Sequence, residues 1–170
     1  MLEVTFRAPE PSDEADVLEA QRIMAREDFT FAFNYSPGDD FSKWTELMAA
    51  RRLGKNLRPG GVAASFELAM VGMRVAGRLS VRHVLNDFLL QQGGHIGYGV
   101  LPEFRGGGIG KRMLQRGFEI TAALGIKRVL VTCDENNAAS RRIIESAGGV
   151  YESSYVGVDV KVPIRRYWFG

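Results

Sequence analysis

The stretch GYGVLPEFRGGGIGKRML, residues 97–114, runs from strand-like sequence through a proline into four glycines among five residues, and then into a basic helix. Glycine loses more conformational entropy on folding than any other residue, so a joint this flexible predicts a use for bare backbone. Successive N–H groups before a helix can converge on one anion, and the helix N-terminus adds about half a positive charge. Lys111 and Arg112 add full charges. The stretch therefore predicts a phosphate or pyrophosphate site; a tight turn that packs strand against helix is the alternative.

Two familiar nucleotide-binding motifs do not fit this stretch. A P-loop needs Ser or Thr after its Gly-Lys pair and a glycine five positions before that glycine, and the chain has Arg112 and Arg105 there. A dinucleotide-binding G-x-G-x-x-G would need glycine where Lys111 or Met113 stands. Both classes are excluded.

Length and composition predict one globular domain over residues 1–170, with 45% hydrophobic and 25% charged residues. The net charge of +2 and the scattered basic pairs argue against nucleic acid as the main partner. A lone cysteine, Cys133, excludes an intramolecular disulfide. The N-terminus does not read as a signal peptide, and no apolar stretch nears the ~20 residues that span a bilayer. We expect a soluble cytoplasmic protein that binds no membrane.

Hydrophobic periodicity predicts alternating strands and helices without a repeat or a linker. The run at 127–133, largely apolar after its first two residues, is typical of a central strand covered on both faces, and the last two strands should form an antiparallel pair. The expected order is β-α-α-β-β-β-α-β-α-β-β, a mixed α/β domain. Strands are expected at 3–9, 62–71, 73–85, 95–102, 127–133, 150–160 and 164–170, and helices at 12–26, about 40–53, 108–124 and 137–147.

Two linked motifs carry a family resemblance. Residues 105–110 have the form R-x-x-G-x-G and follow a strand that ends V-x-P, and about 30 residues later a second element has the form N-x-x-S-x-x-x-I-E-x-x-G. Together they resemble the acyl-coenzyme A site of the GNAT superfamily of N-acetyltransferases, in which the second motif carries a tyrosine where this chain has Ile144. The matching positions of the second motif are Asn137, Ser140, Glu145 and Gly148.

The resemblance implies a fold and a cosubstrate. The fold is a mixed central sheet with a splayed pair of parallel strands and helices on both faces. The cosubstrate is acetyl-CoA, without a metal. Its pantetheine arm would add to the splayed strand at Val100 and Leu101 like a further strand. Asn137 could equally cap its helix. The implied coenzyme-binding residues are Val100, Leu101, Arg105, Gly106, Gly107, Gly108, Ile109, Gly110, Lys111, Asn137 and Ser140.

The activity that the resemblance implies is transfer of an acetyl group from acetyl-CoA to a primary amine by direct attack in a ternary complex. A non-catalytic coenzyme A sensor is a second reading, which Ile144 supports because the usual general acid is missing. A plain interaction domain, with the glycines only in a turn, is a third. Transfer needs a deprotonated amine, a donor for the oxyanion and a proton for the thiolate.

Candidates for these catalytic roles can be named from the sequence. His95, His83 and Glu67 are possible bases, the last because a carboxylate in an apolar strand is costly unless it is employed or exposed. Tyr98 and Tyr151 could replace the missing acid. Each of these residues also has an ordinary structural reading.

The acceptor stays open between a small-molecule amine and a peptide N-terminus. Asn86 and Asp87 could bind its amine. Acidic residues at 39–40 would favour a cationic acceptor, and arginines at 165–166 would favour one with a carboxylate. The resemblance also makes a homodimer possible.

Overall fold

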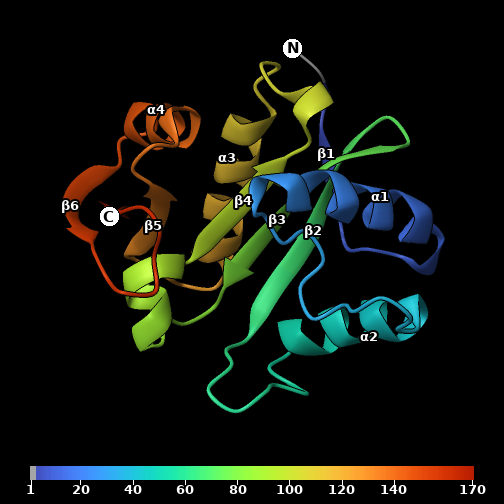
Figure 1. Cartoon of the computed structure of the whole chain (residues 1–170). Coiled ribbons are helices and arrows are strands. Elements are labelled where there is room, and N and C mark those ends of the chain that lie inside the picture. The colour runs from blue at the N-terminus through green and yellow to red at the C-terminus, as the bar shows by residue number, and fades with distance from the viewer. Residues whose placement is uncertain (1–2) are drawn as a thin grey trace.

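One seven-stranded sheet organises the chain in the computed structural model, which describes residues 3–170 (Figure 1). The strand order is β1-β2-β3-β4-β5-β7-β6, and every neighbouring pair is antiparallel except β4 and β5. The predicted order of elements and the single parallel pair are confirmed. The strands are β1 Thr5–Arg7, β2 Ala64–Val71, β3 Arg74–Arg82, β4 Ile96–Val100, β5 Val129–Asp134, β6 Val150–Tyr155 and β7 Ile164–Phe169.

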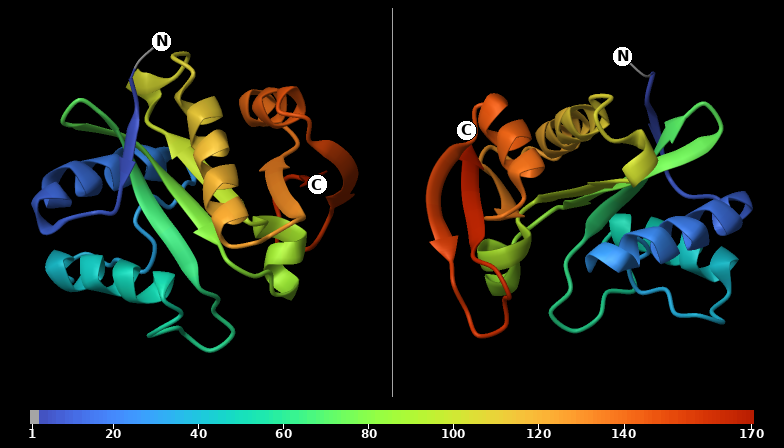
Figure 2. Two further views of the ribbon diagram at one scale, coloured as in Figure 1. Left: turned by 180° about the vertical axis from the view of Figure 1, so that it is seen from behind. Right: turned by 45° about the horizontal axis from the view of Figure 1, so that its top comes forward.

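Helices cover both faces of this sheet, as Figure 2 shows. Neighbouring residues of β2 show the two sides, because side chains alternate along a strand. The ring of Phe66 contacts Trp44 of α2, whereas Glu67 pairs with Arg116 of α3. We call these sides the α1–α2 face and the α3 face. The helices are α1 Glu14–Met24, α2 Phe41–Arg52, α3 Ile109–Ala123 and α4 Ala138–Ser146.

The sheet splits in the middle. Strand β4 pairs regularly with β3 from Val81↔Ile96 to Gly77↔Val100, but its register with β5 is limited to Ile96↔Val131. Beyond this pair the two parallel strands diverge, as the family resemblance implied. No helix among the described residues is long and apolar enough to cross a bilayer.

The chain departs from the predicted elements after β3. The strand expected to reach residue 85 ends at Arg82, and an unpredicted π-helical turn, η3 (Leu89–Gly93), leads into β4. Asn86 stabilises this turn, because its Oδ1 accepts the Leu89 N–H at 2.9 Å. The strand expected at 150–160 likewise ends at Tyr155.

Candidate active site

The glycine loop before α3 needs its glycines for backbone reasons. Gly106 and Gly108 have φ of 81° and 84°, a region that L side chains rarely adopt. Gly110, in the first turn of α3, faces α4 so closely that a Cβ atom would lie 2.9 Å from Cδ1 of Ile143. The loop is therefore both strained for other residues and tightly packed.

This loop presents free main-chain donors. Arg112 N–H is the first in the stretch after Arg105 to find an acceptor, Gly108 O at 3.1 Å, and within residues 3–170 the N–H groups of residues 106–111 have none. The first N–H groups of any α-helix lack an internal partner, and the helix dipole places positive charge there. The loop can thus hold an anion such as a pyrophosphate.

Arg105 braces the loop. Its Nε donates to Val100 O at 3.0 Å, and its guanidinium forms a bidentate pair with Glu27 at 3.1 and 2.6 Å. The side chain predicted as a coenzyme contact is thus engaged with the end of β4 and with the segment after α1.

The open edge of β4 lies next to the loop. Leu101 N–H donates to Ala76 O at 2.9 Å, so strand alternation turns the main-chain groups of Tyr98 and Val100 away from β3 and toward the gap. The carbonyl of Val100 accepts a hydrogen bond from Arg105. The remaining groups of this edge are available to an extended ligand.

At the start of α4, Asn137 acts as the helix cap, because its Oδ1 accepts the Ser140 N–H at 3.0 Å. Ile144, which stands at the tyrosine position, is fully buried in an apolar cluster with Leu114 and Tyr167. It contributes packing and no polar chemistry.

His95 connects three strands. Its Nδ1 accepts the Leu130 N–H at 2.9 Å, its own N–H donates to Leu130 O at 2.7 Å, and its carbonyl accepts the Arg82 N–H at 2.7 Å. Burial, and then the charge of Arg82, lower its pKa. Because a proton on Nδ1 would displace the Leu130 N–H, this geometry disfavours His95 as a base.

The other two predicted bases lie on the α3 face. Glu67 forms a bidentate pair with Arg116, with both contacts at 2.9 Å, and this pair raises the pKa of the arginine. His83 Nε2 lies 2.9 Å from Ser65 Oγ, and burial and then Arg52 lower its pKa. Ser65 shares the face of Glu67, since both alternate with Phe66.

Tyr98 differs from these three residues. It shares the α3 face with Leu79, its partner in β3, but its ring packs against both apolar clusters and beside Gly110 at the start of α3. Its buried hydroxyl has no hydrogen-bond partner among residues 3–170. Burial raises the pKa of Tyr98 to about 12. The hydroxyl therefore keeps its proton through the neutral range.

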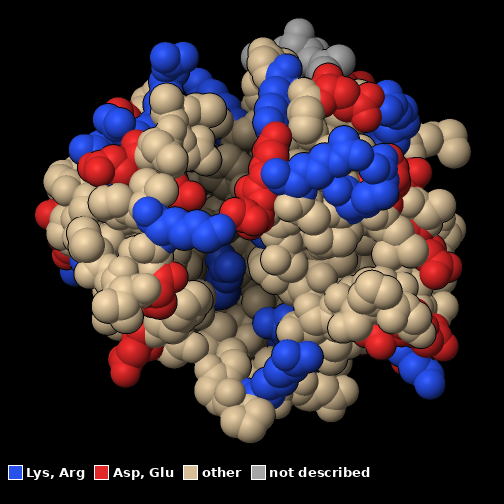
Figure 3. All heavy atoms as spheres, in the orientation of Figure 1, with Lys and Arg blue, Asp and Glu red and all other residues tan. Residues whose placement is uncertain are grey.

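Two cavities adjoin η3, and Figure 3 shows a hollow in one face of the molecule with Lys and Arg atoms inside it. The smaller, about 220 Å³, lies between the end of α2, the start of β2, the end of β3 and η3; we call it the Arg82 cavity. Asn86 lines it. Its further lining includes Phe33, Arg51, Ser80, Arg82 and Leu89.

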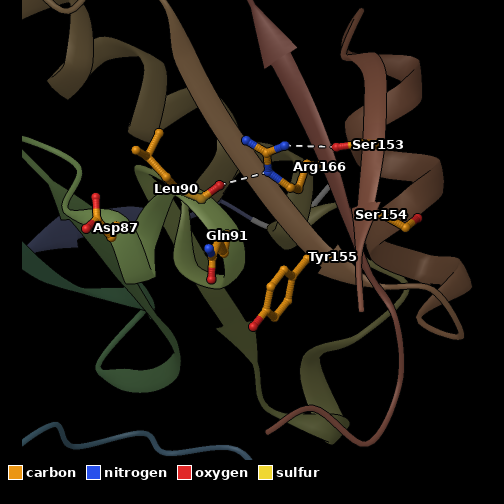
Figure 4. Close-up of a pocket in the computed structure, with 7 residues that line it drawn as sticks. All are labelled: Asp87, Leu90, Gln91, Ser153, Ser154, Tyr155 and Arg166. Carbon is orange, nitrogen blue, oxygen red and sulfur yellow. Dashed lines mark hydrogen bonds between the residues drawn. The ribbon is translucent and has the colours of Figure 1, made fainter. Parts of the chain in front are cut away.

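The larger cavity, about 420 Å³, lies between η3 and strands β6 and β7 (Figure 4). Arg166 points between its walls, donating from Nε to Leu90 O and from Nη1 to Ser153 Oγ, both at 2.8 Å. Asp87 lines this cavity, whereas its neighbour Asn86 lines the Arg82 cavity, so the two residues proposed to bind the acceptor amine lie in different cavities.

The remaining charged candidates have local partners. Asp39 accepts the Ser36 N–H at 2.7 Å and Asp40 caps α2, so both carboxylates serve turns. Arg165 pairs with Glu135 and Glu145. Sequence reasoning missed Arg78 and Arg82, although their spacing of four along one strand places both on the α1–α2 face with Ser80. Within residues 3–170, no three His, Cys, Asp or Glu side chains gather as a metal site.

Comparisons with known proteins place this geometry in context. The chain matches the family model described as an acetyltransferase (GNAT) domain over residues 3–150. A search of curated proteins found no match.

Similar solved structures agree in fold. One is the microcin self-immunity acetyltransferase MccE in complex with acetyl-CoA and AMP, with TM-score 0.71, 17% identity, and coverage of 98% of this chain and 92% of that chain. A second is RimL, a ribosomal alpha-N-protein acetyltransferase in complex with coenzyme A, with TM-score 0.70, 18% identity, and coverage of 98% and 93%. A third is yncA from Salmonella typhimurium with acetyl-CoA, with TM-score 0.66, 18% identity, and coverage of 98% and 92%. At these identities the likeness establishes the fold alone.

Proposed function

Because the chain belongs to the GNAT acetyltransferase family, we propose that it transfers an acetyl group from acetyl-CoA to a primary amine by direct attack in a ternary complex. The observation that carries the proposal is the row of free N–H groups at residues 106–111 beside the open edge of β4. One end of this site suits a pyrophosphate, and the other suits an extended amide-bearing arm.

The coenzyme would lie along these two features. Main-chain donors from Gly106 to Lys111 hold its pyrophosphate, and the edge at Tyr98 and Val100 pairs with its pantetheine arm. Acetyl-CoA supplies the activated acyl carbon. A free N–H on this edge would also donate to the oxyanion that forms on that carbon.

The chain's own residues contribute to proton movement at one end of the reaction. The amine nitrogen bonds to the acyl carbon, the carbon–sulfur bond breaks, and the thiolate leaves with the electron pair. Tyr98 can donate its proton to that sulfur and recover one from water. Since the side chains of Glu67, His83 and His95 are each already engaged within the protein, the amine loses its proton to water.

The acceptor is a small-molecule amine or a peptide N-terminus. Similarity in fold to RimL, an alpha-N-protein acetyltransferase, supports the peptide. The competing function, a coenzyme A sensor without turnover, is favoured by the buried Ile144.

The test has two steps on the full chain. Calorimetric titration with acetyl-CoA measures the dissociation constant, and a panel of amines is then screened for release of the coenzyme A thiol, with the product identified by mass spectrometry. Binding with turnover supports the proposal. Binding without turnover on any amine supports the sensor, and absence of binding rejects both.

Tyr98→Phe tests the acid within the same assay. We expect kcat to fall roughly a hundredfold, with little change in acetyl-CoA binding. Tyr151→Phe is the matched control, because the Tyr151 hydroxyl contacts Ser154 on the exposed strand β6. An unchanged kcat in Tyr98→Phe would leave thiolate protonation to solvent.

A further inference from the structure

Arginines on the α1–α2 face identify a class of acceptor. We infer that the acceptor amine carries an anionic group, a carboxylate or a phosphate, which binds Arg82 and Arg51 in the Arg82 cavity. The inference rests on the proposed acetyl transfer and names the substrate class of that same site.

Arg78 shows that positive charge is built into this face. It is only 4% exposed, donates to Thr30 O at 2.8 Å and Gly97 O at 3.3 Å, and lies 4.3 and 4.2 Å from the ring centroids of Phe29 and Phe33. Its buried Nε has no partner among the described residues. Carbonyl dipoles and aromatic faces thus hold a full charge that no carboxylate among residues 3–170 neutralises.

Arg82 carries the same charge into the cavity. Its Nη1 donates to Gly93 O at 3.2 Å. The other N–H groups of the guanidinium have no hydrogen-bond acceptor among residues 3–170. Burial, and then the charge of Arg51, lower the pKa of Arg82 to about 10, so the group stays cationic at neutral pH. Burial and the nearby Arg58 lower the pKa of Arg51 in turn.

The chain leaves these arginines without counterions, although it pairs many others. Arg105, Arg116 and Arg166, for example, each have a carboxylate within 3 Å. Within residues 3–170 no carboxylate lies within 4.0 Å of Arg51, Arg78 or Arg82. Partly buried like charges without a counterion are unfavourable, and an anionic ligand relieves that cost.

The cavity also lies at the right place for an acceptor. A Cβ atom at Gly97 would lie 2.8 Å from Nη1 of Arg82, so this guanidinium rests against the residue that follows the last β4–β5 pair at Ile96. An anion on Arg82 therefore holds an amine a few bonds away near the open edge of β4. The volume of about 220 Å³ suits a group of carboxylate or phosphate size, and Ser80 and Asn86 offer further polar contacts.

The same charges would assist the reaction. A nearby cation disfavours an ammonium ion, so the arginines lower the pKa of the bound amine and increase its reactive neutral fraction. This compensates for the missing side-chain base.

The test compares matched amines with the full chain at saturating acetyl-CoA. The carboxylate arm pairs free amino acids with their amides, the phosphate arm pairs phosphoethanolamine with ethanolamine, and spermidine represents cationic acceptors. We expect kcat/KM for the anionic member of at least one pair to exceed that of its neutral partner by roughly tenfold or more. The arm that responds identifies the anion.

Variants then locate the effect. Arg82→Gln and Arg51→Gln should each raise KM for the anionic acceptor roughly tenfold while leaving the acetyl-CoA dissociation constant unchanged. Arg52→Gln is the control, since Arg52 is exposed and does not line the cavity. Using both arginines keeps the test valid if one variant folds poorly, which a melting curve reports.

The outcomes separate the two claims. Neutral or cationic amines that react as well as anionic ones, or a KM unchanged in both cavity variants, would overturn the inference and leave the acetyltransferase intact. Failure of every amine to react, despite bound acetyl-CoA, would overturn the proposed function and with it the inference.

Discussion

Replacing Glu67 with Gln tests whether this carboxylate is structural or catalytic. Its two oxygens accept from Nε and Nη2 of Arg116 at 2.9 Å, with side-chain exposures of 9% for Glu67 and 33% for Arg116. Breaking a fully buried ion pair costs about 3–5 kcal/mol. Arg116 reaches solvent and also contacts Glu119 at 3.0 Å, so we expect about 2 kcal/mol, or a fall in Tm of about 5 °C for a chain of this length.

The assay for this prediction is a double-mutant cycle. Melting curves of Glu67→Gln, Arg116→Met and the double variant should give less than additive losses, because the second substitution removes a charge that the first had left unpaired. Values of kcat, corrected for the folded fraction, should stay within about twofold of wild type, since both oxygens of Glu67 are occupied by Arg116. A Glu67→Gln variant with unchanged Tm and a kcat reduced by roughly tenfold or more, restored at high pH, would refute this reasoning and identify Glu67 as a base.

The remaining predictions concern the loop, the strand junction and pH. Gly108→Glu should weaken acetyl-CoA binding by roughly a hundredfold, because the new side chain is bulky and repels the pyrophosphate. The control Gly125→Glu, at a similar φ of 72° after α3, should bind acetyl-CoA normally. Equal acetyl-CoA affinities of the two variants in calorimetry would reject the loop assignment. His95→Leu leaves the buried Leu130 N–H without an acceptor, so urea denaturation should show a loss of about 1–3 kcal/mol, with a smaller loss for His95→Asn; the reverse order would count against the hydrogen bond. Burial lowers the pKa of His83 and His95 below 6.5, so the folded state binds fewer protons and the free energy of unfolding should fall as pH drops below about 6.5, whereas urea titrations that stay level to about pH 5 would contradict this.

Local signals in the sequence were sufficient for the order of the elements, whereas the splayed parallel pair was implied by the family resemblance. The periods of apolar residues predicted each helix and strand of the sheet, since amphipathic helices and alternating strands differ in period. The four glycines before α3 predicted the loop because positive φ and a close helix contact tolerate few other residues. The turn η3 escaped prediction because an Asn86 side chain, rather than a hydrophobic period, stabilises it.

Only the tertiary structure shows which residues far apart in the chain contact each other. The partner of Glu67 is 49 positions away, and that of the His95 ring is 35 away, so neither pairing leaves a local trace. Register and the pleat determine which face a strand residue occupies, and this separated Glu67 from the α1–α2 face and put Arg82 on it. The glycine loop could thus be predicted from contiguous residues. The charge of the Arg82 cavity, in contrast, arises only where the end of α2 meets strands β2 and β3, because an electrostatic environment depends on distance in space and not along the chain.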